Sequence, residues 1–105
     1  MRENKFQSSL VAELKERYPG CIVLKNDPCN RKGIPDLTVL YKNRWGMLEC
    51  KKEEKAGHRP GQDNYVSRLN EMSFARFINP ENKEEVLDEM DKAFKSRRNA
   101  RVPKR

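Results

Sequence analysis

The sequence has no long apolar run, few cysteines and a single histidine. None of its 105 residues belongs to a stretch near the roughly 20 apolar residues that cross a bilayer, and the N-terminus lacks the apolar core of a signal peptide. Cys21, Cys29 and Cys50 are odd in number and show no CxxC spacing. We expect reduced thiols and neither a disulfide framework nor a zinc site. These absences predict a cytoplasmic protein.

Acidic residues are missing from the C-terminal end. The net charge is +7, and six basic residues lie within 95–105, which contain no Asp or Glu. We expect residues 1–94 to form one domain with a modest core and residues 95–105 to form a basic tail. Such a tail usually meets an acidic partner, nucleic acid first. A tail that only aids solubility is the alternative.

Apolar residues recur at regular spacing, although 37% of the residues are charged. This periodicity indicates a folded domain, which the composition alone would not establish. Pro19-Gly20 ends the first helix, and Asn79 followed by Pro80 is typical of an N-cap and the first helical position. The predicted elements are a helix over 3–18, strands over 21–25, 36–40 and 45–51, a helix over 62–72, a strand over 73–78 and a helix over 81–94.

Two of these strands form a hairpin with Tyr41 to Arg44 as its polar turn. If Leu40 pairs with Trp45, Asp36 faces Glu49 across the hairpin, and both lie on the face opposite Leu37, Val39 and Leu48. Like charges placed opposite each other destabilise a sheet, so the pair needs a reason. A divalent cation is the simplest reason, since Mg²⁺ takes one or two carboxylates with waters and substrate phosphates. Apolar residues on both sheet faces predict helices on both sides.

Pro35-Asp36, a gap and Glu49-Cys50-Lys51 resemble the PD-(D/E)XK nuclease signature. With Gly33 before it and Gln62 after it, the pattern is most similar to the stand-alone VRR-Nuc domains of phages and bacteria. The similarity runs from about residue 3 to about residue 90. It implies an α/β, restriction-endonuclease-like core of order α-β-β-β-α-β-α, with a mixed central sheet flanked by helices. A surface hairpin that carries Asp and Glu by coincidence is the alternative.

The resemblance also implies roles for the residues. Asp36 and Glu49 would hold Mg²⁺ or Mn²⁺, and the backbone carbonyl of Cys50 would add a ligand. The ion would polarise the phosphoryl oxygen and lower the pKa of a bound water. Lys51 would position that water or stabilise the charge of the transition state.

Three further polar residues have two readings each. Gln62 begins a helix face and resembles a family residue that reaches toward the metal site, but it could instead bond to loop backbone. Glu3 resembles an auxiliary acid, but a Glu at a helix start is also favoured by the helix dipole. Asp27 is a possible extra ligand, although a residue before Pro is more often a turn former.

Basic and aromatic residues outside the acid pair are candidates for nucleic-acid contact. Tyr41 and Trp45 are more often packing residues, and a lone loop histidine such as His58 is more often a surface residue than a general base. The candidate nucleic-acid-binding residues are Arg31, Lys32, Lys52, His58, Arg59, Arg97 and Arg98.

These features predict a metal-dependent endonuclease that hydrolyses phosphodiester bonds in DNA. The resemblance implies a homodimer, a phage origin with action in the host cytoplasm, and a preference for branched DNA such as four-way (Holliday) junctions. Its dimer surface would lie around Tyr65, Met72 and Phe74. A non-catalytic nucleic-acid-binding module on the same fold is the first alternative. An interaction protein, for example an inhibitor whose tail meets an acidic protein, is the second.

Overall fold

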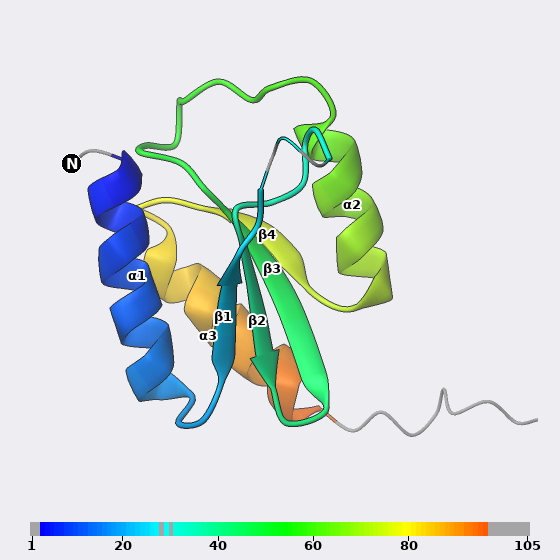
Figure 1. The fold of residues 1–105 in the computed structure, drawn as a ribbon. Helices are drawn as coiled ribbons and strands as arrows, with labels where there is room; N and C mark the ends of the chain where they lie inside the picture. Colours follow the sequence, from blue (N-terminus) through cyan, green and yellow to red (C-terminus); the bar gives the residue numbers. More distant parts are fainter. Residues whose placement is uncertain (1–2, 28, 30, 97–105) are drawn as a thin grey trace, which may run out of the picture.

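The fold is an α/β domain in which a mixed four-stranded sheet is flanked by three helices (Figure 1). The computed structural model describes residues 3–27, 29 and 31–96, Glu3 by its backbone alone. The predicted element order is confirmed. The elements are α1 (Glu3–Arg17), β1 (Ile22–Lys25), β2 (Leu37–Tyr41), β3 (Arg44–Cys50), α2 (Gln62–Met72), β4 (Ala75–Ile78) and α3 (Lys83–Lys95).

The strands lie in the order β1-β2-β3-β4, with the first two pairings antiparallel and the β3–β4 pairing parallel. The predicted hairpin register is confirmed, because Leu40 pairs with Trp45 and Leu37 with Leu48. A tight turn closes the hairpin, and its Lys42 has φ 55, the positive value that short hairpin loops require. The β2–β3 pairing ends at Leu37 and Leu48. Asp36 and Glu49 lie one residue beyond it, at the open end of the hairpin, which we call its mouth.

One face of the sheet holds the core. Because side chains alternate along a strand, Leu37, Val39, Leu48 and Cys50 all point to this face, where each is fully buried. α1 and α3 cover it. They contribute the buried apolar side chains Phe6, Leu10, Leu14, Val86, Leu87, Met90 and Phe94.

The other face is only half covered. α2 contacts β3 and β4, whereas it makes no contact with β1 or β2 (Figure 1). Ile22, Leu24 and Leu40, on the uncovered half, are 56%, 46% and 36% exposed. Helices therefore lie on both sides of the sheet, as predicted, but an apolar strip stays open beside the hairpin. None of the described helices combines the length and apolar character needed to span a membrane.

The start of the last helix differs from the prediction. Asn82, not Asn79, is the N-cap of α3. Asn79 Oδ1 accepts hydrogen bonds from the N–H groups of Glu81 and Asn82, and the Asn79 N–H donates to Asn82 Oδ1. This reciprocal pair closes a separate turn around Pro80, which delays the helix by two residues. Lys95, assigned to the tail from sequence, is the last residue of α3.

Candidate active site

The site is built around two carboxylates at the mouth of the hairpin. The Asp36 N–H donates to Glu49 Oε1 at 3.1 Å, and the Cys50 N–H donates to Asp36 Oδ2 at 3.0 Å. Each carboxylate thus accepts a backbone N–H from the opposite strand. The structure brings the predicted pair together, with Glu49 only 3% exposed.

Burial gives the Asp36 carboxylate an unfavourable environment. It raises the pKa of Asp36 above its ordinary value, while the Cys50 N–H and the charges of Lys51 and Arg59 act in the opposite direction. Because burial prevails, the ionised form of Asp36 is costly without a further positive charge. A cation bound at this position would relieve that cost.

Lys51 and Gln62 complete a buried polar cluster around Glu49. Lys51 Nζ donates to Gln62 Oε1 at 2.8 Å and to the Gly57 carbonyl at 2.9 Å, and lies 3.7 Å from Glu49 Oε2. Gln62 Nε2 donates to Glu49 Oε2 at 2.7 Å. Gln62 Oε1 also accepts the Arg59 N–H at 2.9 Å. Gln62 therefore bonds loop backbone, as one of its two interpretations predicted, and it also bonds the Glu49–Lys51 pair.

Asn26 is a site residue that sequence reasoning missed. Its N–H donates to the Asp36 carbonyl at 2.8 Å, and its side-chain amide donates to the Pro35 carbonyl and to Thr38 Oγ1, each at 2.9 Å. These bonds fix the chain as it enters the acidic strand. The pairing of β1 with β2 would have pointed to it. Lys25 pairs with Leu37, so the residue after Lys25 faces Asp36.

Two glycines bring the loop before Asp36 against the start of α2. Gly33 and Gly61 have φ values of +84 and +86, in the region that favours glycine. A Cβ on Gly33 would lie 2.9 Å from the Gly61 carbonyl carbon and 3.1 Å from Tyr65 Cδ2. The positive φ and this close approach together explain why a glycine stands at position 33.

The contacts of Asp27, His58 and Cys50 show which of the interpretations proposed for each residue the structure supports. Asp27 is exposed and accepts the Cys29 N–H at 2.9 Å, so it forms the turn that was the alternative to ligation. His58 Nδ1 lies 2.8 Å from Asp63 Oδ1, and the imidazole stacks on Phe77 with 4.0 Å between ring centroids. The Cys50 side chain is buried in the core, so only its backbone is near the acid pair.

The apolar and aromatic candidates differ in burial and in contacts. Phe74 is 3% exposed within the core, so its assignment to a dimer surface is wrong, whereas Met72 is 64% exposed. The hydroxyl of Tyr65, a half-buried residue, accepts a bond from Arg31 at 3.3 Å. Tyr41 packs against Tyr18 and Phe94, as its packing interpretation predicted.

Lys52 is exposed just after β3. The side chain of Glu3, and Arg97 and Arg98, lie outside the described part of the chain.

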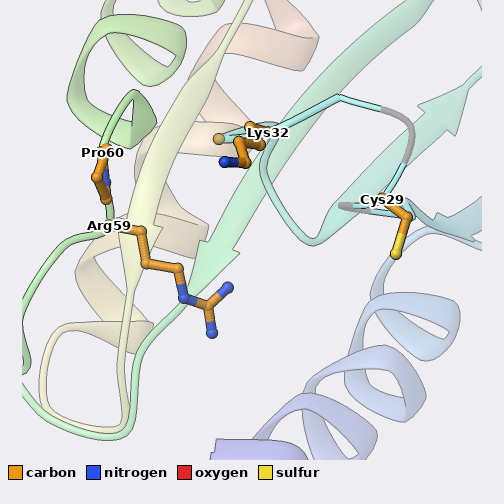
Figure 2. Close-up of a pocket in the computed structure, with 5 residues that line it drawn as sticks. Cys29, Lys32, Arg59 and Pro60 are labelled. Atoms are coloured by element: carbon orange, nitrogen blue, oxygen red, sulfur yellow. The ribbon is translucent and has the colours of Figure 1, made fainter.

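Lys32 and Arg59 lie on opposite walls of a cavity of about 440 Å³ beside the acid pair (Figure 2). Its other lining residues are Cys29, Gly33 and Pro60.

The donor set fits a hard divalent ion. Within the described residues no three His, Cys, Asp or Glu side chains gather as a metal cage. Two neighbouring carboxylates match Mg²⁺ or Mn²⁺, which keep waters and take substrate phosphates as further ligands. Zinc, which prefers nitrogen and sulfur, fits poorly here.

In comparisons with known proteins, no family model and no curated protein matches the chain.

Proposed function

We propose that the protein is a Mg²⁺- or Mn²⁺-dependent endonuclease with a PD-(D/E)XK core of the VRR-Nuc type. The observation that carries the proposal is the grouping of Asp36, Glu49 and Lys51 at one end of the hairpin. A purely structural Glu–Lys pair would not require a second, poorly compensated carboxylate beside it. The raised pKa of Asp36 supports a cation site, because a bound cation would stabilise the buried carboxylate.

Each side chain has a role that its contacts support. Asp36 and Glu49 would hold the ion, with the Cys50 carbonyl as a further ligand. When bound, the ion would polarise the phosphoryl group and ease deprotonation of the attacking water. Lys51, held at 2.8 Å by Gln62 Oε1, would orient that water or meet the charge that develops on the phosphorus oxygens. Gln62 positions Lys51 and Glu49 without itself touching the substrate.

The substrate we propose is DNA, and branched DNA in particular. Lys32 and Arg59 are exposed beside the acid pair, where phosphate groups would approach. A single small domain offers one cutting site, and two related cuts in a junction need two copies of it. A two-fold dimer would supply them. The open apolar strip of Ile22, Leu24 and Leu40 is a candidate for its contact surface.

Cleavage assays on a four-way junction, a linear duplex and a single strand test this proposal. We expect cleavage with Mg²⁺ or Mn²⁺, none with EDTA, and loss of cleavage in Asp36→Asn, Glu49→Gln and Lys51→Met. Asp27→Asn is the matched control, because it removes an exposed acid from the same loop. Retained cleavage in Asp36→Asn would rule out the proposed metal site. DNA binding without cleavage under every condition would favour the non-catalytic module instead.

A further inference from the structure

The cavity beside the acid pair has the form of a ligand site. Its volume of about 440 Å³ falls within the range that holds small ligands. Figure 2 shows Arg59 and Pro60 on the segment that leads into α2, facing Cys29 and Lys32 on the loop before β2. Two cations thus face each other across a space otherwise lined by a thiol, a glycine and a proline ring.

The cavity is also tied to the candidate active site. Gly33, in its wall, is three residues before Asp36, and the charge of Arg59 acts on the Asp36 carboxyl. The Arg59 N–H donates to Gln62 Oε1, the same atom that accepts a hydrogen bond from Lys51. A ligand in the cavity would therefore lie directly beside a phosphodiester at the acid pair.

We propose that this cavity binds one unstacked nucleotide of the DNA strand, next to the bond that is cut. Lys32 and Arg59 would contact its phosphate, and the base would lie against Cys29, Gly33 and Pro60. The inference rests on the proposed function and names its substrate more closely. A base within a continuous duplex must leave the stack to enter, which costs free energy, whereas an unpaired nucleotide at a branch or an end has no such cost.

The ligand is a nucleotide and not merely an anion, because of the lining between the two cations. A site for a small anion alone gains from each further charged or N–H donor, whereas three of the five lining residues here offer apolar surface. The apolar residues offer a surface for a base or sugar, and the two cations match the charge of one phosphate. Both halves are needed for the proposal.

Cys29 makes the site testable without metal or cleavage. Its thiol is exposed and lines the cavity, whereas Cys21 is half-buried away from it and Cys50 is buried. Alkylation of each cysteine by iodoacetamide would be followed by peptide mass spectrometry in EDTA. The chain would be incubated with thymidine 5′-monophosphate, thymidine, inorganic phosphate, a short single-stranded thymidine oligonucleotide or a duplex of the same length.

Thymidine 5′-monophosphate at about ten times its Kd should slow alkylation of Cys29 about tenfold and leave Cys21 unchanged. Thymidine and phosphate should each protect less at the same concentration, and the single strand should protect better than the duplex. Arg59→Ala and Lys32→Ala should each raise the Kd for the monophosphate about tenfold. Lys55→Ala, which removes an exposed cation of the same loop outside the cavity, should leave it unchanged.

Alkylation of Cys29 at the same rate with and without every nucleotide would overturn the inference. Equal protection by inorganic phosphate and by the monophosphate would also overturn it and leave an anion site only. The outcome is separate from that of the proposed function. Junction cleavage without protection removes the nucleotide cavity alone, whereas protection without any cleavage removes the endonuclease and keeps the cavity.

Discussion

Replacing Asp36 by Asn should separate the structural cost of the acid pair from its affinity for a cation. The Asn side chain has the same shape and keeps an oxygen that can accept the Cys50 N–H, as Asp36 Oδ2 does at 3.0 Å. It removes only the charge. Asp36→Ala is a poorer test, because the Cys50 N–H loses this acceptor, which costs about 1–3 kcal/mol when a donor is left buried.

In metal-free buffer the Asn variant should melt at the same or a higher temperature than the wild type at pH 7. The folded-state pKa of Asp36 is raised above its unfolded value, so ionisation opposes folding. The wild type therefore loses stability as pH rises from the unfolded value through the folded one. Below that window both states are protonated and the advantage of Asn disappears. A variant that is less stable at pH 7 yet equal at acid pH would contradict this sign.

Adding Mg²⁺ or Mn²⁺ should reverse the order. An ion that binds only the folded chain stabilises it by about 1.4 kcal/mol at ten times its Kd. For a domain of this size that raises Tm by about 6–11 °C. The Asn variant should show little of this rise, and Asp27→Asn should show all of it. Scanning calorimetry with and without the ion measures both, and an equal rise in wild type and Asp36→Asn would refute the assignment of Asp36 as a ligand.

Three further outcomes follow from particular contacts. Gln62→Ala should abolish cleavage and lower the free energy of unfolding by about 1–3 kcal/mol in urea titrations, because buried groups lose their partner, whereas exposed Asn64→Ala should change neither. Deleting residues 97–105 removes five cations and should flatten the slope of log K against log salt by up to about 4.5 for duplex DNA while leaving metal-dependent cleavage intact. Light scattering should give about twice 12.4 kDa for the wild type and the monomer mass for Leu24→Lys, and an unchanged mass would exclude the open strip as the dimer surface.

The hairpin and its acid pair could be predicted from sequence because both depend on local rules. Strand alternation fixes which side chains share a face, and a short turn fixes the register. Once Leu40 is paired with Trp45, Asp36 and Glu49 must meet at the open end. In a similar way, the spacing of apolar residues along the helices indicates which helix faces are buried.

The rest of the site depends on loops that have no such period. Gln62 contacts Lys51 and Glu49 because the loop over 52–61 places the start of α2 beside the end of β3. Nothing in the charged sequence of this loop specifies that path. The cavity likewise needs two loops distant in sequence. Phe74 was misplaced for a related reason: it precedes β4, and its carbonyl accepts the Met47 N–H, which turns the side chain into the core.

The contact between Gly33 and Gly61 is where the two parts of the site depend on each other. It sets the distance from the loop that carries Asp36 to the helix that carries Gln62, and Gly33 also lines the cavity between Lys32 and Arg59. Gly33→Ala would place a Cβ 2.9 Å from the Gly61 carbonyl carbon and 3.0 Å from its oxygen, so backbone must move. We expect this variant to lose cleavage and nucleotide protection of Cys29 together, with a lower Tm.

Gly20→Ala is the matched control for that variant. Gly20 has φ +89, so Ala there carries a similar left-handed backbone cost of about 1–2 kcal/mol, but a Cβ would meet nothing within 4 Å. It should lower Tm and leave cleavage and Cys29 protection unchanged. If both variants lose function equally, stability alone explains the loss. If Gly33→Ala keeps both functions, the close approach of the two glycines does not set the geometry of the site, and the Gln62 bridge must be positioned by the sheet alone.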